Sequence, residues 1–290
     1  MTRLFHISDL HFGCEDRQAL DWVRERIAAE RPDAVAITGD LTMRARTREF
    51  EACCDWILSL DAPVTVEVGN HDLPYFNLLE RFFTPYRRIR KIERLVEREL
   101  DLPGVSIVPL KTTARAQLRF NWSRGWVGPN ALKKTITCID AIAEPQVVLV
   151  TAHHPLVEAN TRGKALTKGG ERALAALAKA RATAVLSGHV HDPFDLIKET
   201  ANGPIRMIGA GTLSRRIRST PCSFNELRIE GGALNVKVRT FGEDIPKEDM
   251  LIDDVPANAE PPEPGDPVAA VGSDQGTVRF ERSREAPVTR

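Results

Sequence analysis

The sequence predicts an α/β fold with a mixed sheet system, and two patterns lead to this prediction. Short apolar runs alternate with amphipathic stretches along most of the 290-residue chain, which is typical of strands separated by helices. Later in the chain, two apolar runs flank Glu230-Gly231-Gly232-Ala233, a sequence that favours a tight turn between antiparallel strands. A purely parallel Rossmann sheet is therefore not expected.

Eight apolar or β-branched runs are the predicted strands: 4–7, 35–38, 64–68, 147–151, 184–187, 206–208, 227–229 and 234–238. Helical spacing of apolar residues indicates helices around Leu20, Val23 and Ile27, and again around Phe50 and Ile57. We place one large domain at residues 1–242. Seven of the 19 prolines fall in 243–290, among acidic residues without apolar periodicity, so this segment is expected to be a flexible tail.

Charge and composition exclude several classes of protein. Forty Lys and Arg balance 40 Asp and Glu, so no overall basic field indicates nucleic-acid binding. An integral membrane protein is excluded because no apolar run reaches membrane-spanning length. The five cysteines are dispersed without a C-x-x-C pair, and the N-terminus lacks the pattern of a secretory signal. We therefore expect a cytoplasmic protein with reduced thiols.

Five short polar blocks carry the chemistry, and each follows a predicted strand. They are Asp9-Leu10-His11, Gly39-Asp40, Gly69-Asn70-His71-Asp72, His153-His154-Pro155 and Gly188-His189-Val190-His191. Because ligands bind beyond the carboxyl ends of strands in open α/β sheets, we expect the blocks to converge on one site. Imidazole combined with carboxylate oxygen suits iron, manganese or zinc better than magnesium or calcium.

In this order and with their glycines, the five blocks resemble the calcineurin-like metallophosphoesterase family over roughly residues 3–212, or to about 241 with the final hairpin. The resemblance implies a four-layer αββα sandwich of two mixed β-sheets flanked by helices. It also implies two divalent metal ions, which could be Mn, Fe, Zn or Co. The implied ligands are Asp9, His11 and His191 for one ion, Asn70, His153 and His189 for the other, and Asp40 between them.

The resemblance further implies that His71 acts near the leaving group without binding a metal. Asp72 has two interpretations, since it could orient His71 or cap its own turn. The family pattern places the ligand on the first histidine of the His153-His154 pair, so His154 is expected to support a ligand from outside the centre. His6 is expected to be structural.

The implied ligand charges suit an anionic substrate. Two divalent ions roughly 3.5–4 Å apart can clamp a phosphoryl group and lower the pKa of a shared water. Their four positive charges, less two carboxylates and one hydroxide, leave a formal charge of about +1. We therefore expect hydrolysis of a P–O bond by in-line attack, with His71 as general acid or charge stabiliser.

Two basic segments are candidates for contacts with the substrate. Arg87 and Arg88 begin an arginine-rich helical stretch, whose other interpretation is a solvated amphipathic face. Arg162 and Lys164 lie in the loop 160–170 after His153, which we predict at the rim of the site.

Within the family, the blocks are most similar to those of bacterial class III phosphodiesterases acting on cyclic nucleotides or glycerophosphodiesters. The expected partner is thus a small phosphodiester, such as a cyclic nucleotide, and not nucleic acid; self-association is left open. The alternatives are a UDP-diacylglucosamine-type pyrophosphohydrolase, which would need an apolar lid, and a DNA nuclease, which would need a basic groove. A non-catalytic metal-binding scaffold is a further alternative from a different class.

Overall fold

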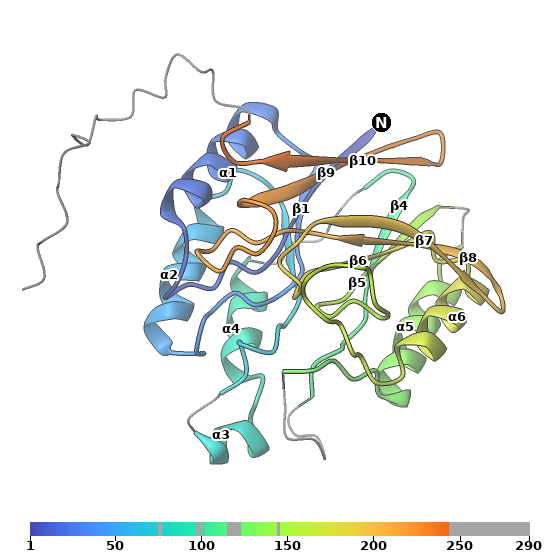
Figure 1. The fold of residues 1–290 in the computed structure, drawn as a ribbon, viewed down its shortest axis with the longest axis horizontal. Coiled ribbons are helices and arrows are strands. Elements are labelled where there is room, and N and C mark those ends of the chain that lie inside the picture. The colour runs from blue at the N-terminus through green and yellow to red at the C-terminus, as the bar shows by residue number, and fades with distance from the viewer. Residues whose placement is uncertain (75–76, 97–99, 101, 115–122, 144–145, 244–290) are drawn as a thin grey trace, which may run out of the picture. The chain divides into compact units, whose positions relative to one another are not determined.

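Two five-stranded sheets form the frame of the protein (Figure 1). The computed structural model describes residues 1–74, 77–96, 100, 102–114, 123–143 and 146–243. The first sheet has the order β10-β9-β1-β2-β3, and the second has the order β4-β5-β6-β8-β7. The strands are β1 (Thr2–Ile7), β2 (Ala34–Ile37), β3 (Val64–Val66), β4 (Val105–Pro109), β5 (Val147–Thr151), β6 (Ala184–Ser187), β7 (Phe194–Thr200), β8 (Gly203–Gly209), β9 (Ser223–Glu230) and β10 (Ala233–Thr240).

Both sheets are mixed. In the first, β1, β2 and β3 run parallel, while β9 is antiparallel to β1 and to β10. In the second, β4, β5, β6 and β8 run parallel and β7 is antiparallel to β8. The predicted hairpin is confirmed, since β9 and β10 pair across Gly231 and Gly232, whose φ angles of 56° and 82° suit a tight hairpin turn.

Helices cover the outer faces of the two sheets. They are α1 (Arg17–Glu30), α2 (Thr47–Leu58), α4 (Arg87–Val96), α5 (Pro129–Asp140) and α6 (Gly170–Lys179), whereas the short α3 (Leu78–Phe83) lies away from the sheets (Figure 1). Side chains of α1, α2 and α4 share an apolar core with the first sheet, and those of α5 and α6 share another with the second. A third core, which includes Leu4, Leu149 and Leu227, draws its residues from both sheets. The layers therefore follow the order helix, sheet, sheet, helix, and the predicted αββα sandwich is confirmed.

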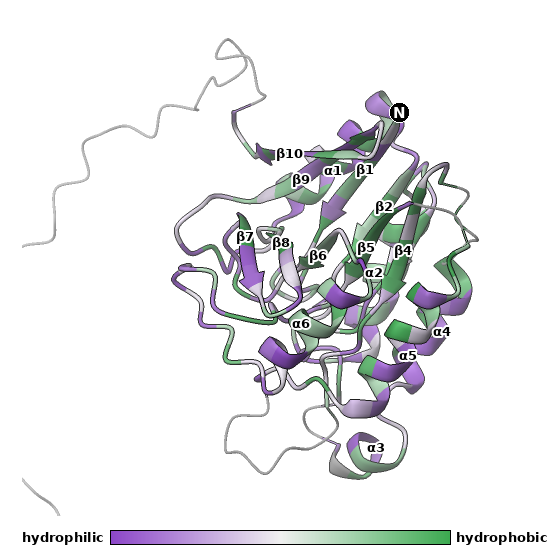
Figure 2. Ribbon diagram, turned by 90° about the vertical axis from the view of Figure 1, so that its right-hand side faces the viewer, coloured by the Kyte–Doolittle hydropathy of each residue, from purple (hydrophilic) through white to green (hydrophobic). Residues whose placement is uncertain are grey.

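Two edge strands, β4 and β7, were absent from the prediction. Strand β7 alternates half-buried and exposed positions and includes Asp195, Lys198 and Glu199, so it lacks the apolar run that marks the central strands. Figure 2 shows this difference as a hydrophilic β7 and a largely hydrophobic β5. Strand β4 ends at Pro109, which an edge strand tolerates because one of its sides needs no partner.

Phe224 of β9 is fully buried and contacts the rings of Phe5 and Trp22, at centroid distances of 4.8 and 5.1 Å. Phe224→Ala should lower the free energy of unfolding by about 3–5 kcal/mol, because it removes buried apolar area and leaves a cavity. Urea denaturation would measure the loss. Val238→Ala on the neighbouring β10 is the matched control, since Val238 is 38% exposed; equal stability of the two variants would contradict this account of the core.

The predicted tail, 243–290, lies outside the described residues from residue 244 onward. Among the residues that the structure describes, no helix has both the length and the apolar character needed to cross a membrane.

Candidate metal centre

The five polar blocks lie at the carboxyl ends of β1, β2, β3, β5 and β6, and hydrogen bonds join them across the two sheets. In the first sheet, the amide of Asp9 donates to the carbonyl of Gly39 at 3.1 Å. The amide of His189, which follows β6, donates to Asp9 Oδ2 at 2.8 Å. The predicted convergence of the blocks on one place is therefore confirmed.

Glycine is required at two positions because the strand ends approach so closely. A Cβ atom on Gly69 would lie 2.1 Å from the backbone nitrogen and Oδ1 of Asp40. A Cβ on Gly188 would lie 2.4 Å from Asp9 Oδ2. Real Cβ contacts are never this short, so any other residue would push the two carboxylates out of place.

Five of the predicted ligands have a left-handed backbone. The φ angles lie between 47° and 71° for Asp9, His11, Asp40, His189 and His191. Such conformations cost a non-glycine residue of order 1–3 kcal/mol each and cluster at functional sites. Here they turn each side chain sharply away from the strand direction and toward the common centre.

The first predicted ligand set, Asp9, His11 and His191, is brought together. Asp9 Oδ1 lies 3.2 Å from His191 Nε2 and 3.6 Å from His11 Nε2. The two imidazole Nε2 atoms are 3.1 Å apart. All three side chains are buried, and each offers a donor atom within 4.8 Å of the others.

The second set, Asn70, His153 and His189, meets Asp40 beside the first. His153 Nε2 lies 3.1 Å from Asn70 Oδ1 and 3.4 Å from Asp40 Oδ2. The same Asp40 oxygen is 3.7 Å from His11 Nε2 of the first set. His189 is close by, with its ring centroid 5.3 Å from that of His153. Asp40 thus stands between the two sets.

The donor set fits two divalent ions. Among the described residues, the nitrogens near the buried Asp9 Oδ1 are those of the two histidines in its own set, and the buried His11 Nδ1 has no hydrogen-bond partner. Burial raises the pKa of Asp40, but the neighbouring imidazoles, His153 above all, outweigh this and hold the pKa well below its usual range. Conversely, burial lowers the pKa of His153, whereas the Asp40 charge raises it to about 9. Asp40 is therefore charged and attracts a cation.

Hydrogen bonds outside the centre fix which imidazole nitrogen faces it. His153 donates from Nδ1 to the carbonyl of Thr38 at 2.8 Å, and His191 from Nδ1 to that of Arg216 at 2.7 Å. Each ring therefore directs its Nε2 at the centre, where a bound metal ion would take the place of a proton on that nitrogen. Burial lowers the pKa of His189 to about 3, so this imidazole is neutral.

His154 is bound at both ring nitrogens by the protein. Nδ1 lies 2.9 Å from Thr112 Oγ1, and Nε2 donates to the carbonyl of Ser123 at 2.8 Å. Its ring centroid is 4.5 Å from that of His189. Although His154 lies close enough to be a ligand, these bonds favour the supporting role that the sequence suggested.

His71 and Asp72 are held by different partners. His71 donates from Nδ1 to the carbonyl of Met43 at 2.7 Å, so its Nε2 faces the site. The Asp72 carboxylate accepts from the amides of Thr42 and Gly69, both at 2.9 Å. No hydrogen bond joins Asp72 to the His71 ring within the described part of the chain, so the ring is oriented by the Met43 carbonyl. Asp72 instead connects the two loops that carry Thr42 and Gly69. Burial, with the Asp40 charge, raises the pKa of Asp72 to about 7.

Arg216 is the site residue that the sequence did not reveal. Its Nη1 lies 3.1 Å from His71 Nε2 and 3.3 Å from His11 Nε2. The residue belongs to the loop that follows β8, in the segment Ser214-Arg215-Arg216-Ile217-Arg218. Three arginines in five residues were the available signal, but no spacing rule connects them with the histidine blocks.

The predicted substrate residues occupy two different settings. Arg87 and Arg88 both contact the Glu80 carboxylate, at 3.1 and 2.9 Å. These ion pairs favour the interpretation of the arginine-rich helix as a solvated amphipathic face over a role in binding the substrate. Arg162 and Lys164 are exposed and flank Gly163, where a Cβ would lie 2.8 Å from the carbonyl of Val190. Their loop therefore runs directly beside the His189–His191 block, which is where a rim residue must lie.

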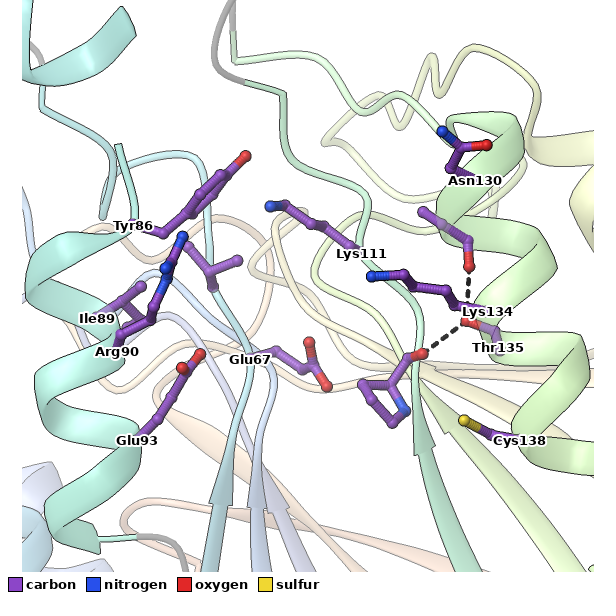
Figure 3. Close-up of a pocket in the computed structure, with 13 residues that line it drawn as sticks. Glu67, Tyr86, Ile89, Arg90, Glu93, Lys111, Asn130, Lys134, Thr135 and Cys138 are labelled. Atoms are coloured by element: carbon purple, nitrogen blue, oxygen red, sulfur yellow. Dashed lines mark hydrogen bonds between the residues drawn. The ribbon is translucent and has the colours of Figure 1, made fainter. Parts of the chain in front are cut away.

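A pocket of about 570 Å³ opens between α4 and α5 (Figure 3). Figure 3 shows Tyr86 and Arg90 on one wall, Lys134 on the other, and Lys111 reaching between them. Lys111 Nζ lies 3.1 Å from the centre of the Tyr86 ring. Of the α4 arginines, Arg90 rather than Arg87 or Arg88 lines this pocket.

Histidine, carboxylate and amide side chains gathered at facing strand ends of an αββα sandwich are typical of dinuclear metal-dependent hydrolases. Residues 2–193 match the model of the calcineurin-like phosphoesterase family, and the chain belongs to that family. The protein is accordingly a metal-dependent phosphoesterase. The resemblance found in the five blocks is confirmed at the level of the family.

Solved structures share the fold at low sequence identity. A dimetal phosphatase from Danio rerio has a TM-score of 0.61 and 14% identity, over 82% of this chain and 96% of that one. Purple acid phosphatase PPD1 from yellow lupin has a TM-score of 0.60 and 13% identity, over 82% of this chain and 51% of that one. GAP50, described as the anchor in the inner membrane complex of Plasmodium, has a TM-score of 0.57 and 10% identity, over 83% and 85%. A search of curated proteins gives no match.

Proposed function

We propose that the protein hydrolyses small phosphodiesters, such as cyclic nucleotides, at a centre of two divalent metal ions. The observation that carries the dinuclear assignment is Asp40 Oδ2, which lies 3.7 Å from a histidine nitrogen of one set and 3.4 Å from one of the other. The diester preference rests on the similarity of the five blocks to those of bacterial class III phosphodiesterases.

In this proposal, Asp9, His11 and His191 bind one ion, Asn70, His153 and His189 bind the other, and Asp40 bridges them. When bound, two such ions activate water and stabilise the charge on the phosphoryl oxygens. The metal could be manganese, iron, zinc or cobalt, since the mixed ligand set accepts each of them.

In this proposal His71 donates a proton to the leaving group, which requires the Arg216 guanidinium, now 3.1 Å from His71 Nε2, to turn away from that nitrogen. Its Nδ1 proton is held by the Met43 carbonyl, so any second proton is carried on Nε2, the atom that faces the site. As water oxygen bonds to phosphorus and the P–O bond breaks, the leaving oxygen takes the proton from Nε2. Arg162 and Lys164 are proposed to attract the anionic substrate from the rim, whereas Arg87 and Arg88 are bound to Glu80.

The first test is hydrolysis of bis(p-nitrophenyl) phosphate and 3′,5′-cyclic AMP with added Mn²⁺, by the wild type and by His189→Ala. The wild type should hydrolyse at least the synthetic diester. His189→Ala should lose metal and at least about 100-fold in rate, because it removes an inferred ligand and substitutions even of residues behind the ligands cost 10–100-fold. Metal content measured by mass spectrometry separates ligand loss from misfolding.

Metal binding without turnover of any ester would instead favour the scaffold alternative.

All five cysteines have free thiols in the structure, which supports the proposed location in the reducing cytoplasm.

A further inference from the structure

The pocket between α4 and α5 lies beside the metal centre without including it. Its volume of about 570 Å³ is in the range of sites that hold small organic molecules. The described residues that line it include none of the inferred metal ligands. Its walls are nevertheless continuous with the centre. Val68 is two residues before Asn70, and Lys111 precedes Thr112, whose hydroxyl lies 2.9 Å from His154 Nδ1.

The walls of this pocket are held in place by the fold. On the α5 side, the hydroxyl of Thr135 donates to the carbonyl of Pro109 at the end of β4, at 2.7 Å. At the base, the hydroxyl of Thr151 donates to the Glu67 carboxylate at 2.7 Å. On the α4 side, Ile89 is buried in the core of the first sheet. The pocket is therefore formed before any ligand binds.

Two cations line the pocket from opposite sides. Figure 3 shows Arg90 on the α4 wall and Lys134 directed across the gap from the α5 wall. Neither forms an ion pair with a carboxylate of the described residues, whereas Arg87 and Arg88 both contact Glu80. Because two cations repel each other across a pocket, an anion between them is attracted by both.

Three other charged side chains reduce this positive charge without cancelling it. Lys111 Nζ lies 3.1 Å from the centre of the Tyr86 ring, whose electrons stabilise the ammonium group. Glu67 and Glu93 also line the pocket, but neither pairs with the two cations on the described walls. Three cations against two carboxylates leave the described lining with a formal charge of +1, which a single negative charge neutralises.

The rest of the lining is largely apolar. Val68, Ile89, Pro109 and Ala131 contribute hydrocarbon surface between the charged groups. A small inorganic anion would leave this surface in contact with water. An anionic group on an apolar body would cover it, and this burial adds to the attraction of the cations.

We propose that this pocket binds a small organic anion, a carboxylate on an apolar body, as a ligand distinct from the phosphoester at the metal centre. The guanidinium of Arg90 can donate two parallel N–H bonds to a carboxylate, and the ammonium of Lys134 approaches the same group from the other wall. The apolar body lies against Val68, Ile89 and Pro109. Binding makes and breaks no covalent bond.

The first test is calorimetric titration of the Mn²⁺-loaded full chain with cinnamate, an aromatic carboxylate. The double variant Arg90→Gln/Lys134→Gln should raise the Kd at least about tenfold, because charge-assisted hydrogen bonds are lost. The matched control is Lys91→Gln/Lys133→Gln, which removes the same charge from the exposed neighbours outside the pocket. Its Kd should equal that of the wild type.

Two further ligands separate the charge from the apolar body. Cinnamamide has nearly the same shape as cinnamate but no charge, and acetate has the charge but almost no body. Each should bind at least about tenfold more weakly than cinnamate. Binding of cinnamamide as tight as that of cinnamate would contradict the role of the two cations.

Alkylation of cysteines by iodoacetamide reports where the anion binds. Cys138 is exposed on the pocket wall, whereas Cys14 is half-buried and its amide donates to the carbonyl of His11 at 2.7 Å. Cinnamate should slow alkylation of Cys138 and leave that of Cys14 unchanged, as measured by mass spectrometry. Slower alkylation of Cys14 alone would place the anion at the metal centre and overturn the proposal.

The outcome is independent of the proposed function. His189→Ala, which is expected to lose metal, should bind cinnamate as tightly as the wild type. A wild type that hydrolyses no ester but binds cinnamate in this pocket would refute the hydrolysis proposal alone. A wild type that binds no cinnamate, or a double variant that binds it unchanged, would refute the anion site whatever the turnover.

Discussion

Asp40→Asn is expected to lower ester hydrolysis by at least about 100-fold and to reduce bound metal from two ions per chain to one or fewer. Asp40 Oδ2 lies near both ligand sets, at 3.7 Å from His11 Nε2 and 3.4 Å from His153 Nε2. Asparagine keeps the size of the side chain, and its amide oxygen can still accept the His71 amide, which now donates to Asp40 Oδ1 at 2.8 Å. The substitution therefore removes the charge while keeping the contact.

Metal content by mass spectrometry and turnover of bis(p-nitrophenyl) phosphate would be measured on the same preparation. Asp21→Asn is the control, because Asp21 is a surface carboxylate of α1 whose ion pair with Arg24 is exposed. That variant should keep both metal ions and full activity. Two ions per chain in Asp40→Asn, with activity unchanged, would show that Asp40 does not bridge them.

The convergence of the five polar blocks could be predicted from the sequence because each one follows an apolar strand. Strand ends converge wherever parallel strands share a sheet, so Asp9, Asp40 and Asn70 come together from local pattern alone. The glycines carry the remaining information, since Gly69 and Gly188 mark where one strand end passes within van der Waals contact of another. Sequence order and side-chain type thus predicted that the blocks converge, whereas their division into two ligand sets came from the resemblance to the family.

The partners of His71 could not be predicted in the same way. Asp72 is adjacent in sequence and was one candidate for orienting the ring, but its carboxylate accepts from the Thr42 and Gly69 amides. The ring is held instead by the backbone carbonyl of Met43. Every residue has such a carbonyl, so no residue type in the sequence indicates this contact. Arg216 was missed for a related reason: its place depends on the path of a loop after β8, which follows no helix or strand period.

His71→Ala is expected to lower kcat by roughly 10²–10⁴-fold while the metal content stays the same, which is the range for loss of a positioned general acid. His71 Nε2 faces the site, and its Nδ1 is fixed on the carbonyl of Met43. The residue contributes no donor atom to either predicted ligand set, so its removal should leave the ions in place. Steady-state kinetics and metal analysis of the same protein would check both parts.

The size of the loss should depend on the leaving alcohol. p-Nitrophenol leaves readily as an anion and needs little help from an acid, whereas an alkyl or nucleoside alcohol needs a proton as the P–O bond breaks. His71→Ala should therefore slow 3′,5′-cyclic AMP more than bis(p-nitrophenyl) phosphate, and added imidazole should restore part of the rate. Equal losses on both diesters would exclude proton donation by His71 and leave it a role in stabilising phosphoryl charge, whereas loss of metal would assign it to the ligand set.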